Sequence, residues 1–184
     1  IYEDGVQQEI DSFQLVQVDQ LPSLEGAPLV EVGRRRSDQE RAASQADVRV
    51  FVIFLDDYHV RQGNSLRARQ LLVEFLENSL IPTDLVGVMF PLMPLEGVRL
   101  TRNHQAVINA INSFEGVKYR YFVRNQFESA YNHYPTEIVE RMRNDVSLSA
   151  LKGLMIYLGS MREGRKSVLL VSEGYSNYVP PQMR

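Results

Sequence analysis

The chain contains no cysteine and no tryptophan, and it has only three histidines among its 184 residues. The absence of cysteine excludes disulfides, thiolate zinc sites and thiol nucleophiles. The histidines, His59, His104 and His133, do not have the spacing of a zinc site. No apolar run is as long as a bilayer span, so we expect no membrane insertion.

Neither sign of charge dominates the chain. Its net charge is −3 and its pI is near 5.7, which gives no general attraction to nucleic acid or to anionic lipid. With 44% hydrophobic and 23% charged residues, the chain can bury the core of one domain of ordinary size. Residues 1–5 open in the middle of a pattern, which is compatible with a processed or excised fragment.

The domain division follows from turn residues and from polarity. Residues 1–18 alternate loosely and predict an N-terminal β appendage. Residues 19–47 read as a linker whose arginine triplet at 34–36 is either an anion patch or a solvated linker or helix face. Residues 48–176 are the predicted domain, with an insert at 117–146 and a tail at 177–184.

Acidic residues follow two buried apolar runs directly. The run VRVFVIFLDD, residues 48–57, ends in Asp56 and Asp57, and SVLLVS, residues 167–172, ends before Glu173. The carboxyl ends of parallel strands form the crevice that receives ligands in open α/β sheets. Each acid alone could equally cap a helix or a turn. Three acids at two strand ends predict a shared site.

The periodicity predicts the element order β-α-β-β-α-insert-α-β. A helix begins at Asn64 or Ser65, a short third strand at 98–100 pairs antiparallel with its neighbour, and the last helix begins at Asp145 or Ser147. The first helix carries a predicted core stripe of Leu66, Leu71, Leu72, Phe75, Leu76 and Leu80. The expected fold is a Rossmann-like α/β/α sheet, mostly parallel with one antiparallel edge strand, that stops after its fourth strand. Residues 2–18 or a second chain should cover its open edge at 167–172.

The insert interleaves basic and aromatic side chains. Such a pattern can stack on nucleic acid, bind protein, or pack the insert on the body. The net charge makes nucleic acid the least favoured of the three. The residues predicted to contact a partner are Tyr119, Tyr121, Phe122 and Arg124.

Several phrases together resemble a von Willebrand factor type A domain, most closely its bacterial VWFA-related group. The resemblance covers most of residues 48–176 and, more weakly, the first 15. The phrases are YEDGVQQEI at 2–10, VFVIFLDD at 50–57, DLVGV at 84–88, LT at 100–101, SAL at 149–151, LG at 158–159, EGRK at 163–166 and VSEG at 171–174.

The resemblance implies a metal-ion-dependent adhesion site that is degenerate in this chain. Asp56 stands for the first ligand, but Tyr58 and Val60 stand where the family has serines. Asp145 lies about where a threonine is expected, and Glu173 replaces an aspartate. Asp56, Asp57, Asp145 and Glu173 are thus the predicted metal residues, for weakly held Mg²⁺ or Ca²⁺ or for no metal at all. His59 is either a further ligand or a solvent-facing loop residue.

The implied function is a non-catalytic adhesion or scaffold module that binds a protein ligand or its own copy, outside the cytoplasm, with no nucleic-acid or membrane partner. Two alternatives stay open. One is a hydrolase-like enzyme that uses the carboxylate cluster, and the other is a structural domain that needs no metal.

Overall fold

A computed structural model describes residues 2–3, 6–7, 31–45, 48–161 and 164–175 of the chain. Its centre is an open parallel sheet of three strands in the order β4-β3-β5. The strands are β3 (Arg49–Leu55), β4 (Leu85–Met89) and β5 (Arg165–Val171). Strand β3 is the middle strand because it carries the longest run of fully buried apolar residues. The predicted mixed α/β class with a mostly parallel sheet is confirmed.

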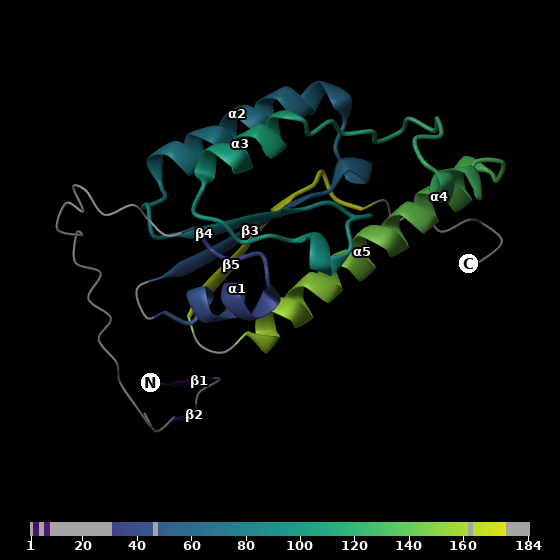
Figure 1. The fold of residues 1–184 in the computed structure, drawn as a ribbon. Helices are drawn as coiled ribbons and strands as arrows, with labels where there is room; N and C mark the ends of the chain where they lie inside the picture. Colours follow the sequence, from purple (N-terminus) through teal and green to yellow (C-terminus); the bar gives the residue numbers. More distant parts are fainter. Residues whose placement is uncertain (1, 4–5, 8–30, 46–47, 162–163, 176–184) are drawn as a thin grey trace.

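Helices cover both faces of the sheet (Figure 1). Alternate residues of β3 enter separate cores, as the two-residue period of a strand requires. Val52 and Phe54 pack with α1 (Arg36–Ala43) and α5 (Thr136–Ser160). Ile53 and Leu55 pack with α2 (Gln62–Asn78) and α3 (His104–Asn112). The remaining short helices are η1 (Asp57–His59), η2 (Leu95–Gly97) and α4 (Gln126–Ser129).

The predicted third strand at residues 98–100 is wrong. Residues 98–100 form no strand, and the residue that follows them, Thr101, makes a single antiparallel bridge to Val86. Helix η2 ends just before this segment at Gly97, and Asn103 caps α3 just after it by accepting a hydrogen bond from the Ala106 amide. A segment held between two helices this close has room for a single pair of backbone hydrogen bonds.

Two helices differ from their predicted course. Helix α5 begins at Thr136, about three turns before the predicted start, because its first turns bury Glu140 and Arg143 and so lack an apolar stripe. In α2, Leu72 and Leu76 are buried as predicted, but Leu66 and Leu71 are more than half exposed. Helix α2 begins at Gln62, so the start predicted at Asn64 or Ser65 is two to three residues late.

The predicted linker contains a helix in its described part. Helix α1 buries Ala43 in the core shared with α5, and Gln39 accepts a hydrogen bond from the Leu100 amide. The N-terminal segment forms a hairpin of β1 (Tyr2–Glu3) and β2 (Val6–Gln7), which pair with each other. Residues 8–18 and the tail at 177–184 lie outside the described residues, so the predicted cover of the β5 edge stays a prediction. No helix in the described ranges is both long and apolar enough to cross a membrane.

Candidate functional site at the carboxyl ends of β3 and β5

Strands β3 and β5 bring the two acidic junctions side by side. The strands pair in parallel with Leu55 opposite Val171, so the next residues of each strand leave the sheet together. The Asp56 amide donates to the Val171 carbonyl at 3.0 Å, and the Glu173 amide donates to the His59 carbonyl at 2.9 Å. The site is therefore built on a strand pair and not on a free loop.

Asp56 is fully buried, and its carboxylate receives hydrogen bonds from three side chains. His59 Nδ1 lies 2.8 and 2.9 Å from the two oxygens. Ser147 of α5 donates to Oδ1 at 2.9 Å, and Ser172 at the end of β5 donates to Oδ2 at 3.1 Å. A buried carboxylate needs such partners because an unpaired one is costly to remove from water.

His59 is fully buried, so the prediction of a solvent-facing loop residue is wrong. The residue belongs to η1, which turns its ring back over Asp56 three residues earlier. Its Nε2 lies 2.7 Å from Asn144 Oδ1, and its ring centroid is 4.6 Å from that of Tyr175. Burial and the charge of Asp56 raise the pKa of Tyr175.

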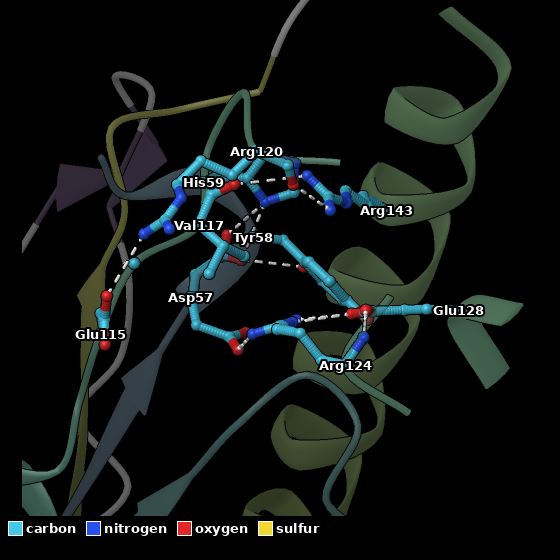
Figure 2. A network of polar contacts seen from close by, with 12 residues as sticks. Asp57, Tyr58, His59, Glu115, Val117, Arg120, Arg124, Glu128 and Arg143 are labelled. Atoms are coloured by element: carbon cyan, nitrogen blue, oxygen red, sulfur yellow. Dashed lines mark hydrogen bonds and ion pairs between the residues drawn. The ribbon is translucent and has the colours of Figure 1, made fainter. Parts of the chain in front are cut away.

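The side chain of Asp57 contacts the insert and not the residues that bind Asp56. Arg124 Nη1 lies 2.8 Å from Asp57 Oδ2, and Arg124 also binds Glu128 at 2.7 Å (Figure 2). Glu128 in turn accepts from the Tyr58 hydroxyl at 3.0 Å. Burial raises the pKa of Asp57, and the Arg124 guanidinium offsets only part of that effect. Arg124 is thus an internal tie between the body and the insert.

Arg143 makes a second tie, from α5. That helix takes up the end of the predicted insert of residues 117–146, so the insert in the structure is residues 117–135. Arg143 Nη1 and Nη2 donate to the carbonyls of Val117 and Arg120, at 3.4 and 2.7 Å (Figure 2). Its guanidinium also lies against the rings of Tyr58 and Tyr121, at 5.0 and 5.1 Å from their centroids. The side chain is 2% exposed, so it fixes the start of the insert from inside.

Glu173 caps α2. Its Oε1 accepts from the Arg61 amide at 2.8 Å and from Asn64 Nδ2 at 2.7 Å, and its Oε2 lies 3.1 Å from Arg61 Nε. Burial opposes the charge, but these hydrogen bonds together with Arg61 and Lys118 lower the pKa of Glu173. Of the two interpretations of this acid, helix cap or member of a shared site, the contacts of Glu173 agree with the helix cap.

The four predicted metal residues do not form one ligand set. Asp56 is satisfied by its three donors, Asp57 is paired with Arg124, and Glu173 is used as a cap. Asp145 is exposed on α5, while its neighbours Asn144 and Ser147 contact His59 and Asp56. Among the residues that the structure describes, no group of three or more His, Asp or Glu side chains is arranged to hold a metal ion.

The predicted partner residues divide into exposed and buried ones. Tyr119 is 55% exposed and Phe122 is 47% exposed, whereas Tyr121 is half-buried against Arg143. Burial and Glu140 raise the pKa of Tyr121 to about 12. We define the insert surface by its exposed apolar side chains, which are Tyr119, Phe122, Val123, Phe127 and Tyr134.

Tyr119 has a left-handed backbone, with φ at +64°. It follows Lys118 in a turn closed by a hydrogen bond from the Arg120 amide to the Val117 carbonyl. Gly or Asn normally occupies such a position, and a bulky residue there costs on the order of 1–2 kcal/mol. Arg61 and Lys118 lie near the tyrosine ring, at 6.0 and 5.5 Å from its centroid.

Sequence reasoning missed Ser147, Ser172 and Asn144 as members of the site. Ser172 ends a predicted strand, so its position at the same sheet edge as Asp56 could have been expected. Ser147 and Asn144 carry no such sign, because the predicted helix began at or after Asp145 and its facing side was unknown. Both serines donate to Asp56, and the ring nitrogens of His59 contact Asp56 and Asn144, so neither serine of the site is paired with the histidine.

No protein-family model, no curated protein and no solved structure matches this chain.

Proposed function

We propose that the chain is a non-catalytic protein-binding module of the von Willebrand A type, and that it binds its partner through the insert surface. The partner is a protein ligand or a second copy of the chain. By the same resemblance, the module works outside the cytoplasm, as part of a secreted or periplasmic protein. An adhesion or scaffold role fits a surface whose exposed aromatic side chains are carried by a rigid domain.

The left-handed backbone of Tyr119 is the observation that carries this proposal. A strained residue that is also buried can be explained by packing, but Tyr119 is more exposed than buried. Strain at an exposed aromatic residue is a reason to look for a functional contact. Tyrosine is enriched at the centres of protein interfaces, where its ring and hydroxyl can both be used.

The anchoring of the insert supports the same proposal. Arg124 and Arg143 tie both ends of residues 117–128 to the body through buried or half-buried contacts. A rigid surface loses little conformational entropy when it binds, so its exposed aromatic side chains can contribute most of their contact energy.

The experiment compares Tyr119→Gly with wild type in stability and in binding. Glycine relieves the left-handed strain, so we expect the free energy of unfolding to stay within about 1 kcal/mol of wild type or to rise. The binding probe is a phage-displayed library of random peptides, selected on the immobilised wild-type chain. Peptides that bind wild type should lose at least ten-fold in affinity for Tyr119→Gly.

The matched control is Leu71→Ala, which removes a side chain of similar exposure from α2. It should leave peptide binding unchanged. A Tyr119→Gly variant that is strongly destabilised, or that binds the selected peptides as well as wild type does, would contradict the proposal.

Hydrolysis by the carboxylate cluster stays an alternative prediction. The contacts of Asp56, Asp57 and Glu173 favour it less, because each carboxylate is already held by donors of the chain itself. Binding of Mg²⁺ or Ca²⁺ likewise stays a prediction, which the metal titration described next tests.

A further inference from the structure

We propose that the imidazole of His59 permanently occupies the position that the resemblance assigns to a divalent metal, so that this site is complete without one. The proposal does not rest on the proposed function, because metal binding is measured without any partner.

Three donors of the chain already occupy the buried carboxylate of Asp56, on both of its oxygens. Two carboxylate oxygens offer about four lone-pair positions. Oδ1 accepts from His59 and Ser147, and Oδ2 contacts His59 and accepts from Ser172. A cation bound to both oxygens would have to displace His59, whose Nδ1 would then be left buried without a partner.

His59 is held from every side of its ring. Asp56 lies at Nδ1, Asn144 lies at Nε2, and Tyr175 packs on the ring. The backbone is fixed as well, because the His59 amide donates to the Asp56 carbonyl and the His59 carbonyl accepts from Glu173. With no exposed surface, the ring cannot turn outward to admit an ion without unpacking the junction.

The atoms around the ring explain why the position suits a cation once the ring is removed. The space would be lined by the Asp56 carboxylate and the amide oxygen of Asn144, which contact the ring, and the hydroxyls of Ser147 and Ser172 bind the same carboxylate. Carboxylate, hydroxyl and carbonyl oxygens are the ligands that Mg²⁺, Mn²⁺ and Ca²⁺ prefer. His59→Ala should therefore turn a closed polar junction into an open oxygen-lined cavity.

The test measures metal binding and thermal unfolding of wild type and His59→Ala, with MnCl₂, MgCl₂ and CaCl₂ each alone and with imidazole as a separate probe. Wild type should bind no Mn²⁺ by electron paramagnetic resonance and should show no change in Tm. The variant should unfold at lower temperature and recover about 3–6 °C in Tm at a ligand concentration ten times the Kd, with either Mn²⁺ or imidazole. His104→Ala, which removes an imidazole from α3, is the matched control and should respond to neither.

Binding of Mn²⁺ by wild type that disappears in Asp56→Asn would overturn the proposal. So would a folded His59→Ala variant that responds to neither Mn²⁺ nor imidazole. If His59→Ala does not fold, the wild-type titration alone decides: bound Mn²⁺ that depends on Asp56 overturns the proposal, and its absence supports it.

Discussion

The junction around Asp56 and the insert surface are built in opposite ways. At the junction, a buried carboxylate has a donor for each of its oxygens, and no atom of Asp56 or His59 reaches solvent. On the insert surface, Tyr119 and Phe122 expose about half of their area, and one of them holds a strained backbone. The difference indicates that the buried junction stabilises the fold and that the exposed surface is available for binding.

Removing the Asp56 carboxylate should disrupt the junction around it. Of the substitutions considered, we expect this one to lower the free energy of unfolding most. Asp56→Ala leaves the buried donors of His59 and Ser147 without an acceptor and removes the acceptor of Ser172, at a cost of about 3–5 kcal/mol in the free energy of unfolding. Urea unfolding monitored by tyrosine fluorescence measures it. Asp145→Ala, at an exposed position of α5, should change stability by less than about 0.5 kcal/mol. Equal effects of the two substitutions would remove the distinction between junction and surface.

Replacing Arg143 should separate the insert from the body, with a somewhat smaller effect. Arg143→Leu loses the hydrogen bonds to the Val117 and Arg120 carbonyls and leaves buried Glu140 without its ion-pair partner 3.6 Å away. We expect a loss of about 2–4 kcal/mol and faster proteolysis within residues 117–134. Lys152→Leu, at an exposed position of the same helix, is the control. An insert that remains as resistant to protease as in wild type would show that Arg143 is not its anchor.

Removing the charge of Glu128 should change how the stability of the protein depends on pH, which tests how the insert is held. Burial opposes the charge, but hydrogen bonds from Arg124 hold the pKa of Glu128 below its usual 4.5. The stabilisation is therefore present above the unfolded-state value and is lost as the pH falls through the lower folded-state pKa. Glu128→Gln should cost about 1–2 kcal/mol at pH 7 and flatten the stability curve below pH 4.5.

The control for that curve is Glu115→Gln, which removes a carboxylate that is 50% exposed. It should leave the slope below pH 4.5 as in wild type. A Glu128→Gln variant whose stability falls with acid as steeply as that of wild type would contradict the role given to Arg124.

The sequence predicted the carboxyl ends of β3 and β5 well, because the position of a buried strand and the residue at which it ends depend on neighbouring residues in the sequence. The apolar runs ending at Asp56 and before Glu173 led to β3 and β5, and two parallel neighbours bring their ends together. The partners of Asp56 could not be predicted in the same way. Ser147 lies 91 residues from Asp56, on a helix whose first turns bury polar side chains and so give no apolar period.

The insert shows the reverse pattern. Its aromatic composition was visible in the sequence, but which rings are exposed depends on the positions of Arg124 and Arg143. The sequence could not separate Tyr119 from Tyr121, because one faces solvent and the other stacks on a residue that comes from α5. Likewise, the left-handed backbone at Tyr119 has no sign in the sequence, since tyrosine is not a residue that prefers it.

The junction around Asp56 also bears on the order in which the chain folds. Its donors come from η1, from α5 and from the end of β5, with Ser172 separated from Asp56 by 116 residues. Contacts of such separation form slowly, because a long loop must close before they stabilise anything. The network can be complete only after β5 has joined β3, because Ser172 directly follows that strand and the Asp56 amide donates to the carbonyl of its last residue, Val171. Joining of the last strand and completion of the hydrogen bonds around Asp56 are thus a single cooperative event, which makes partly folded forms of this domain costly.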